Sequence, residues 1–387
     1  MNAVTLNATH ITIADNLETV DRQQWNRLVA GNNPFLRHEF LSALERHRCV
    51  GKESGWQPQH LLVHDDDKQL LGASPLYIKH HSHGEFVFDW AWAEAYQRHH
   101  LAYYPKLVSA IPFTPMTGQR LLMAEDCDQQ QVGRRLIDAA IKLAQELDYS
   151  SVHWLFPTEA QKEKFQQQGL IIRTGCQYHW HNRGYEDFEH YLSHFSSRKR
   201  KNVLKERRQV ETAGVTFRRL HGDEVSAAEW ALFHKFYRDI YDRKWGFPTL
   251  TLGFFEEIGR TLADQVMLVL AYRNNKCIAA ALNLRSDDTL YGRHWGCSEQ
   301  LPGLHFEACY YQGLEYCMEH SLQRFEPGAQ GEHKIARGFL PTATWSAHWI
   351  GHPGFRDAIA RYTHLEAKEL AGHMRQLEAH SPFRTPA

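Results

Sequence analysis

The feature that most constrains the fold of this chain is an order of hydrophobic runs that occurs twice. In the first half, HLLVHDDDKQLLGASPLYIK (60–79) reads as a strand, a polar turn and a strand, and GEFVFDWAW (84–92) supplies a third strand-like run. In the second half, VMLVLAYRNNKCIAAALNLR (266–285) repeats strand, turn and strand, and TLYGRHWG (289–296) is the third run. A long helical pattern and a short strand follow each set. We therefore predict two mixed α/β units built on one plan.

The two long helical patterns carry their apolar residues at the spacing of a single helix face. In the first pattern these residues are Val132, Leu136, Ala140, Leu143, Ala144 and Leu147, and in the second they are Phe306, Cys309, Tyr310, Gly313, Leu314 and Cys317. Each face is expected to pack on its sheet, followed by short strands at 150–156 and 323–328. Further helices are predicted at 16–30, 33–47, 226–245 and 252–264.

Composition indicates a folded protein without general affinity for polyanions. The 387 residues are 43% hydrophobic and 12% aromatic, so the chain can bury substantial cores. The 44 basic and 45 acidic residues leave a formal charge of -1, which argues against broad binding of nucleic acid or anionic membrane. Seven cysteines without a C-x-x-C pair, no basic leader and no long apolar run predict a soluble, cytoplasmic protein without a membrane span.

The 26 histidines include one dense group, His80, His81 and His83, between two strand-like runs. A metal site usually shows a pattern such as H-E-x-x-H or a cluster of ligands close by, and this group has neither. We interpret it as an exposed loop and predict no metal site.

The boundary between the two units is predicted at YEDFEHYLSHFSSRKRK, residues 185–201, where apolar periodicity gives way to charge. This places a first unit at residues 1–190 and a second at residues 191–387. Both have an ordinary domain size.

A mixed sheet whose third strand leads through a turn into a helix resembles the fold of the N-acetyltransferase (GNAT) superfamily. That superfamily holds the pyrophosphate of coenzyme A with Q/R-x-x-G-x-G/A at a helix start, through backbone N–H groups. The first half has Gln130, Gly133 and Arg135 at the matching positions. Arginine in place of the last small residue would crowd a phosphate, so we predict that this site does not bind coenzyme A. The second half shows no intact loop of this kind either.

Over nearly its whole length the chain resembles the FemAB-like N-acyltransferase family of peptidoglycan biosynthesis and recognition, which is related to the Fem-type aminoacyl and peptidyl transferases. The segments that carry the resemblance are FDWAWAEAY (88–96), YYPKLVSAIPFTPMTGQRLL (103–122), LHFEACYYQGLEYC (304–317) and FEPGAQGEHKIARGFLPTATWSAHW (325–349). The resemblance implies two tandem GNAT-like domains and transfer of an aminoacyl group from charged tRNA to an amine of a cell-wall precursor. The long helical arm of some Fem enzymes has no counterpart here.

The loop FEPGAQGEHKIARGF (325–339) is dense in polar groups between two apolar runs, and the resemblance places a donor-facing lysine here, matched by Lys334. When an amine attacks an ester or thioester, negative charge collects on the carbonyl oxygen, and a fixed cation lowers that barrier. The alternative is a surface turn with solvated charges. Residues expected to approach the donor beside the lysine are Gly328, Gly331, His333, Arg337 and Gly338.

Acyl transfer to an amine also releases a proton, and three glutamates near this loop are candidates for the base: Glu307, Glu326 and Glu332. Glu326 is preferred, because it lies at the strand end that leads into the loop. Glu307 lies near His305, itself a candidate substrate contact, at a helix start. Either glutamate could instead cap or solvate a helix end, and deprotonation assisted by the substrate would need neither.

An aromatic stretch in the first half, residues 88–118, predicts either an acceptor pocket or a core between the two units. Tryptophan and tyrosine stack on sugar rings or cover apolar ligand surface, and the prolines of this stretch stiffen its loops. The residues expected to contact the acceptor are Asp89, Trp90, Tyr96, Tyr104, Lys106 and Thr114.

Basic residues near the predicted boundary recur at spacings of three, four and three, which makes one helical stripe of Arg198, Lys201, Lys205 and Arg208. Such a stripe can follow a phosphate backbone, so tRNA is a candidate partner. A solvated helix face is an equally open alternative. Val203, Leu204 and Val210 are expected on the opposite, packed side of the helix.

These patterns favour an N-acyltransferase that moves an aminoacyl or acyl group onto an amine, with the acceptor in the first unit and the donor in the second. Aminoacyl-tRNA and acyl-CoA both stay open as donors, and no tightly bound cofactor is expected. The contrasting hypothesis is a non-catalytic module that binds a peptidoglycan fragment or an anionic polymer in a cleft between the units. A hydrolase is less favoured, because the sequence lacks a G-x-S-x-G motif.

Overall fold

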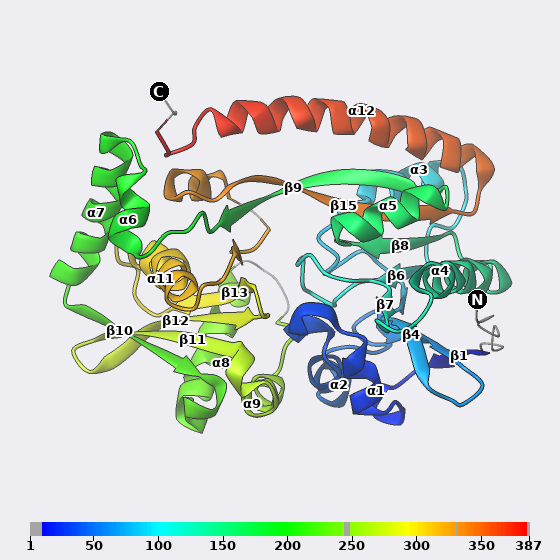
Figure 1. Ribbon diagram of the computed structural model, residues 1–387, viewed down its shortest axis with the longest axis horizontal. Helices are drawn as coiled ribbons and strands as arrows, with labels where there is room; N and C mark the ends of the chain where they lie inside the picture. Colours follow the sequence, from blue (N-terminus) through cyan, green and yellow to red (C-terminus); the bar gives the residue numbers. More distant parts are fainter. Residues whose placement is uncertain (1–9, 244–247, 330, 385–387) are drawn as a thin grey trace, which may run out of the picture. The chain divides into compact units, whose positions relative to one another are not determined.

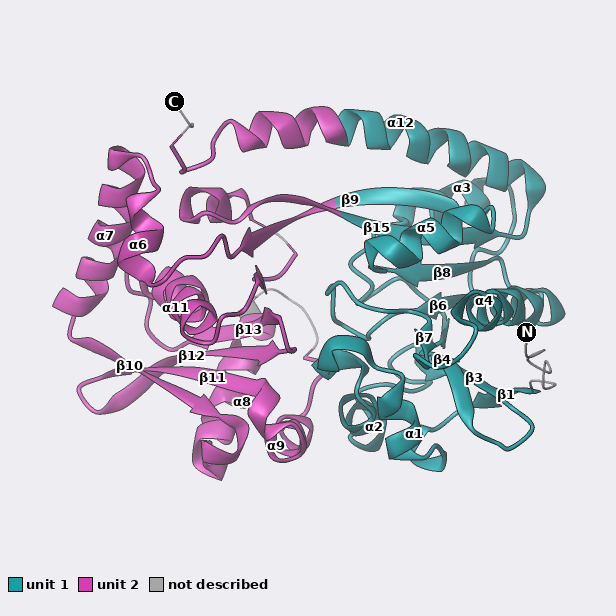
Figure 2. Cartoon of the chain, viewed as in Figure 1, with its two compact units in different colours: residues 1–175, 344–370 teal, residues 176–343, 371–387 magenta. Residues whose placement is uncertain are grey.

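The computed structural model describes residues 10–243, 248–329 and 331–384. The chain divides into two compact units (Figure 2). Unit 1 holds residues 1–175 and 344–370, and unit 2 holds residues 176–343 and 371–387. The points of division fall inside strand β9 (Ile171–His181), strand β15 (Leu340–Ile350) and helix α12 (Pro353–Glu378).

This division differs from the predicted split at residue 190, because residues 344–370 return to unit 1. Their return is fixed by a strand pairing: Ser346 to Ile350 of β15 lie antiparallel to Ser151 to Leu155 of β8. Strands β8 and β15 are almost two hundred residues apart in sequence, and no local sequence pattern predicts that they pair.

Unit 1 contains two sheets. One is antiparallel with the order β1-β3-β4-β7, and the other has the order β15-β8-β6-β5-β2, in which β6 and β8 are parallel. The strands are β1 His10–Ala14, β2 Trp56–Pro58, β3 His60–His64, β4 Leu70–Ser74, β5 Tyr77–Lys79, β6 Lys106–Ser109, β7 Leu122–Met123 and β8 Ser151–Leu155. The strands predicted within 60–79 and 150–156 are confirmed, with Pro75 in the gap between β4 and β5.

The helices of unit 1 are α1 Arg22–Arg27, α2 His38–Arg46, α3 Trp90–Arg98, α4 Gln129–Glu146 and α5 Glu159–Gln167, with part of α12. The predicted apolar face of α4 is packed in a core cluster, in which Val132, Leu136 and Ala140 are buried. Leu147, the last predicted member of that face, is exposed, because α4 ends at Glu146 and the chain turns away.

One predicted strand is wrong: residues 84–89 form a connecting segment, and residues 90–92 begin α3. The segment alternates, but in the reverse sense of an amphipathic strand. Glu85 and Asp89 are buried against a lysine, whereas Phe86 and Phe88 are exposed. An alternating pattern alone therefore does not show which set of side chains faces the interior.

Unit 2 is built on an antiparallel meander, β10-β11-β12-β13, and β14 then pairs in parallel with β13 (Figure 1). The strands are β10 Val215–His221, β11 Val266–Arg273, β12 Lys276–Arg285, β13 Thr289–Cys297 and β14 Arg324–Glu326. Between β13 and β14 runs a helical stretch of α10 Leu304–Phe306, a π-helical turn Glu307–Tyr311 and α11 Gln312–Glu319. Meander, helix and parallel strand follow the predicted order.

The other helices of unit 2 are α6 Phe188–Ser193, α7 Ser197–Thr212, α8 Ala227–Arg243 and α9 Leu252–Thr261. Ring contacts of Phe255 on α9 with Trp230 (stacked) and Phe233 (edge-to-face) on α8 join the two helices. The four further helices predicted from sequence correspond to α1, α2, α8 and α9. Within residues 10–243, 248–329 and 331–384, no helix is long and apolar enough to cross a membrane.

Candidate functional site

The candidate site lies in unit 2, where β13 and β14 stop pairing. Their parallel pairing ends at Tyr291 and Glu326, and the next residues, Gly292 and Pro327, line a cavity of about 270 Å³. Glycine at position 292 allows this close approach, because a Cβ atom there would lie only 3.2 Å from the Cα atom of Pro327. Strands β13 and β14 thus run close together just before they separate.

A β-bulge in β13 shapes the wall of this cavity. Leu282 of β12 pairs with His294, and the next residue, Asn283, pairs with Gly292, so Arg293 is an extra residue in β13. A bulge bends its strand and redirects the side chains around it. Asn283, Gly292, Arg293 and His294 all line the cavity.

Lys334, the predicted catalytic lysine, lies at the same cavity. It belongs to the 3-10 helix η7 (Glu332–Arg337), and only 2% of the residue is exposed. Its Nζ donates a hydrogen bond of 2.7 Å to the carbonyl oxygen of Gly328, which has the positive φ of 95° that glycine adopts readily. Burial lowers the pKa of Lys334 to about 8. The side chain is therefore cationic at pH 7 and close to its titration.

Three histidines at the cavity are held neutral at pH 7. Burial, together with neighbouring positive groups, lowers the pKa of His305 to about 4 and lowers that of His333 as well. Burial and the adjacent Arg293 hold the pKa of His294 well below its usual value. His333 also shares a hydrogen bond of 2.9 Å with the hydroxyl of Tyr310. These rings offer hydrogen bonds to a ligand without adding charge.

Arg337 holds the loop in place. Its guanidinium bonds to both carboxylate oxygens of Glu206, at 2.6 and 3.2 Å, donates to the carbonyl oxygen of His333 and lies over the ring of Phe306. Bidentate pairs of this kind fix direction as well as distance. Arg337 is not among the described residues that line the cavity, so its predicted contact with the donor stays a prediction.

None of the three candidate bases is among the described residues that line the cavity. Both carboxylate oxygens of Glu307 accept hydrogen bonds from Arg207, at 2.9 and 3.0 Å. Glu326 is fully buried, 3.3 Å from the Nε of Arg324. Glu332 is exposed. The structure thus gives Glu307 a structural ion pair and leaves the choice of base open.

Sequence reasoning missed Asn283, Arg293 and His294, which reach the cavity from β12 and β13. A usable signal was present for one of them, because Asn283 is a polar residue inside the apolar run CIAAALNL. A buried amide in such a run needs a hydrogen-bonding partner and often faces a ligand. The bulge that adds Arg293 left no mark in the sequence.

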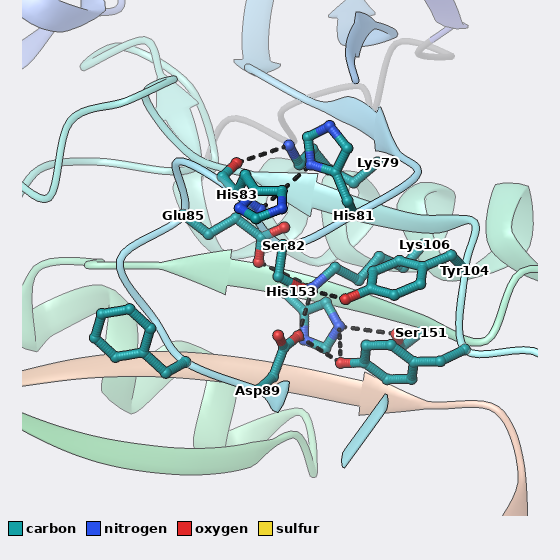
Figure 3. Close-up of polar contacts among 12 residues, drawn as sticks. Lys79, His81, Ser82, His83, Glu85, Asp89, Tyr104, Lys106, Ser151 and His153 are labelled. Atoms are coloured by element: carbon teal, nitrogen blue, oxygen red, sulfur yellow. Dashed lines mark hydrogen bonds and ion pairs between the residues drawn. The ribbon is translucent and has the colours of Figure 1, made fainter. Parts of the chain in front are cut away.

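In unit 1, several predicted acceptor residues gather around a buried lysine (Figure 3). The Nζ of Lys106 donates to Ser82 Oγ and to Glu85 Oε2, both at 2.9 Å, and to Asp89. Asp89 also accepts a hydrogen bond of 2.6 Å from the hydroxyl of Tyr103. This buried cluster ties the segment before α3 to strand β6.

Charges in the buried cluster shift one another's protonation. Burial raises the pKa of Glu85 to about 7, and burial lowers the pKa of Lys79 to about 7. Burial acts to raise the pKa of Asp89 too, but Lys106 and the hydrogen bonds outweigh it and lower this pKa. Lys79 lies over the ring of Trp56, 3.8 Å from its centroid. Two groups of the cluster therefore titrate close to neutral pH.

The remaining predicted acceptor residues differ in their surroundings. Tyr104 is half-buried and joins the cluster through a 2.8 Å hydrogen bond with Ser82. Tyr96 is buried in an aromatic stack, Thr114 is buried beside a backbone carbonyl, and Trp90 is 45% exposed. Asp89, Lys106 and Tyr104 are thus brought into one network, and Trp90 lies at the surface of unit 1.

The predicted loss of a pyrophosphate site in unit 1 has a structural basis. Gln130, Gly133 and Arg135 lie within α4, and the residue before the helix, Asp128, accepts backbone N–H bonds of 3.0 Å from Gln130 and Gln131. A carboxylate at this place occupies the donors that a phosphate would use and repels its charge.

The predicted basic stripe lies on helix α7, and its four members are all exposed: Arg198, Lys201, Lys205 and Arg208. Val203 and Val210 are buried on the other side as expected. The placement of Leu204 among them is wrong, since it is 46% exposed; the adjacent Arg207 is the residue that anchors the helix through Glu307. The stripe is therefore free to meet a ligand.

Metal-binding side chains do not gather in the described part of the chain: no three His, Cys, Asp or Glu residues there form a possible metal site. His80 and His83 are exposed, as predicted for a loop, and His81 is partly buried. All seven cysteines are free.

Two mixed α/β units of this plan define a tandem protein of the GNAT-like fold. The structure is similar to the C-terminal domain of a putative lysylphosphatidylglycerol synthetase from Agrobacterium fabrum, with 8% identity, 91% of this chain and 97% of that chain covered, and a TM-score of 0.54. It is also similar to FemX, with 11% identity, 91% and 100% coverage and a TM-score of 0.51. The structure is similar as well to L-PGS from Bacillus licheniformis, with 11% identity, 84% of this chain and 95% of that chain covered, and a TM-score of 0.50. At these identities the likeness shows the fold.

The chain belongs to the FemAB-like family, described as peptidoglycan biosynthesis/recognition, whose profile matches residues 16–385. No curated protein matches the sequence significantly. The family predicted from the sequence is thus confirmed.

Proposed function

We propose that this protein is an N-acyltransferase that moves an aminoacyl or other acyl group onto an amine of a cell-wall precursor. The observation that carries the proposal is the buried ammonium of Lys334 at the cavity where β13 and β14 separate. An ester or thioester carbonyl in this cavity would have a cation beside its oxygen. Membership in a peptidoglycan biosynthesis/recognition family supports a cell-wall acceptor.

In the proposed reaction a neutral amine attacks the donor carbonyl, and its electron pair forms the new C–N bond. The carbonyl oxygen then carries a negative charge, to which Lys334 donates a hydrogen bond. As the charge returns, the bond to the leaving oxygen or sulfur breaks, and the proton lost by the attacking nitrogen ends on that atom, which departs as an alcohol or thiol. A single fixed donor of this kind contributes about 10²–10³-fold to kcat.

We infer that unit 2 takes the donor, aminoacyl-tRNA or acyl-CoA, and that unit 1 takes the acceptor, in the cytoplasm where both kinds of donor occur. The exposed basic stripe on α7 supports a tRNA donor. The carboxylate of Asp128 at the start of α4 speaks against coenzyme A in unit 1. The exposed ring of Trp90 and the half-buried Tyr104 are the proposed acceptor contacts.

Mass spectrometry of candidate acceptors, after incubation with charged tRNA or with acyl-CoA, tests this function. A mass increase equal to the acyl group is expected, and treatment with RNase beforehand removes it only if tRNA is the donor. Lys334→Ala should lower turnover about 100-fold. Lys235→Ala, which removes an exposed lysine of α8 outside the cavity, is the matched control and should keep turnover.

A protein that retains ligand affinity but modifies no acceptor under any of these conditions would instead be the non-catalytic binding module. If Lys334→Ala and Lys235→Ala both keep the turnover of the wild type, Lys334 has no role in the mechanism.

A further inference from the structure

Lys334 is a buried cation whose charge the described protein does not balance. Two other cations of unit 2 face carboxylates: Arg207 pairs with Glu307 and Arg337 with Glu206. Among the described residues, the hydrogen-bond partner of the Lys334 ammonium is a backbone carbonyl, which leaves two of its three N–H groups without an acceptor. A buried charge without a counter-charge is costly, so a ligand of opposite charge would stabilise it.

The wall of the cavity adds to this positive character. Arg293 also lines it, and burial lowers the pKa of Arg293 to about 10, which leaves it protonated at pH 7. The histidines of the wall are neutral at that pH. In the described part of the chain, the cavity-lining residues include no aspartate and no glutamate. The cavity thus presents two cations and several neutral hydrogen-bonding groups.

The adjoining space is large enough for a side chain of several atoms. A second cavity of about 470 Å³ shares Trp295 and His305 with the first, and its wall includes Leu301 and Leu304. A carboxylate on this second wall, that of Glu299, already lies 3.2 Å from a guanidinium nitrogen of Arg273. A chain that enters between the two cavities would therefore pass apolar surface and end near the cations.

We propose that the cavity beside Lys334 selects a donor whose acyl group bears a carboxylate side group, of the glutamyl or dicarboxylic-acyl type. This inference rests on the proposed acyl transfer and names the donor for the same site. The carboxylate would balance the charge of Lys334 in the ground state, and the remaining N–H group of Lys334 would face the reacting carbonyl. A cationic side chain such as that of a lysyl group would meet two like charges and no acid.

A donor series that differs only in the charge of the side group tests the selection. Glutamyl, glutaminyl and lysyl esters of one carrier have side chains of similar length with charges of −1, 0 and +1. We expect kcat/KM to fall in that order, by about 10-fold from glutamyl to glutaminyl, which is the ratio that one charge-assisted hydrogen bond supports. Arg293→Gln removes one positive charge from the wall but keeps Lys334, so it should lower the ratio, whereas Lys235→Gln should keep it.

Binding without catalysis provides a second measurement. Glutarate should raise the Tm of the wild-type protein, and glutaramide, its neutral diamide, should raise it less. Lys334→Met removes the cation and should abolish the effect of glutarate, while Lys235→Met should leave the effect in place. Inorganic phosphate serves as the probe for an anion that comes from the carrier of the donor instead of from the acyl group.

The outcomes separate this inference from the proposed function. Transfer of glutamyl, glutaminyl and lysyl groups at equal kcat/KM, with loss of turnover in Lys334→Met, would overturn the selection and keep the transferase. Stabilisation by glutarate that needs Lys334, without transfer from any donor, would keep the anion site and overturn the transferase. Stabilisation by phosphate alone would assign the anion to the carrier and overturn the acyl side group.

Discussion

Lys334 combines a proposed catalytic role with a cost to folding stability. The unfolded chain holds the lysine proton up to its ordinary pKa of 10.5, whereas the folded protein releases it above about 8. Between these values the unfolded state binds more protons, so the free energy of unfolding rises with pH in this window. Below pH 8 both states are protonated and the destabilisation is complete.

Replacing this lysine should therefore stabilise the protein. Lys334→Met is expected to raise the free energy of unfolding at pH 7 by as much as about 3 kcal/mol, the value of the pKa difference. The gain should shrink as the pH rises from 8 to 10.5. Urea unfolding of the wild type and Lys334→Met at several pH values measures it. A variant less stable than the wild type at pH 7 would show that a counter-charge is already in place.

The protonation of the same residue should appear in the rate of the reaction. Because only the ammonium form stabilises the carbonyl oxygen, kcat/KM should fall as the pH rises through about 8. Lys334→Arg keeps a cation that stays protonated to much higher pH, so this descending limb should vanish in the variant. Profiles of kcat/KM between pH 6 and 10 make the comparison. An unchanged limb in Lys334→Arg would assign it to another group.

At the scale of elements, apolar runs and helical spacing were enough to predict the strands of 60–79 and 266–285 and helix α4, since these strands are almost entirely buried and the helix packs one face in a core. The prediction failed for residues 84–92, because ion pairs to Lys106 turn the side chains of Glu85 and Asp89 inward. The bulge at Arg293 could not be predicted either, since an extra residue in β13 is defined only by the pairing of this strand with β12. The sequence of the loop was enough to name Lys334, whereas the cavity beside it could be recognised only in the folded structure.

The segment before α3, whose acidic side chains face inward, is held in this conformation by the buried cluster, and this can be tested. Lys106→Met would leave Glu85 and Asp89 buried without their cation, at a cost of about 3–5 kcal/mol. Hydrogen exchange should quicken across residues 82–90 before the rest of unit 1 responds. Lys142→Met, at a side chain that is 76% exposed, is the control and should change neither property. Equal protection in both variants would deny the cluster this anchoring role.

At the scale of the whole molecule, the two repeats of the sequence do not coincide with the two units. Residues 344–370 belong to unit 1, where β15 covers one side of β8. Sequence periodicity shows how many elements a unit has but cannot show that one of its strands comes from a distant part of the chain. This is why the two-unit plan was predictable and its boundary was not.

The shared strand makes unit 1 dependent on the C-terminal part of the chain. Truncation after residue 343 should unpair β8 along Ser151 to Leu155 and destabilise unit 1, even though residues 1–175 remain. Hydrogen exchange measured by mass spectrometry should show lost protection in β8. A truncation after residue 378, which keeps all of β15 and α12, is the control. Retained protection of β8 in the shorter chain would contradict this dependence.

The route of the chain through β15 also sets an order of events during synthesis on the ribosome. Residues 1–175 emerge first, yet their second sheet has to wait for a strand that is translated after nearly all of the meander of unit 2 has left the exit tunnel. Until then β8 presents an unpaired edge, the kind of surface that recruits chaperones or a neighbouring nascent chain. Slow translation upstream of codon 344 would lengthen that exposure and lower the yield of folded protein.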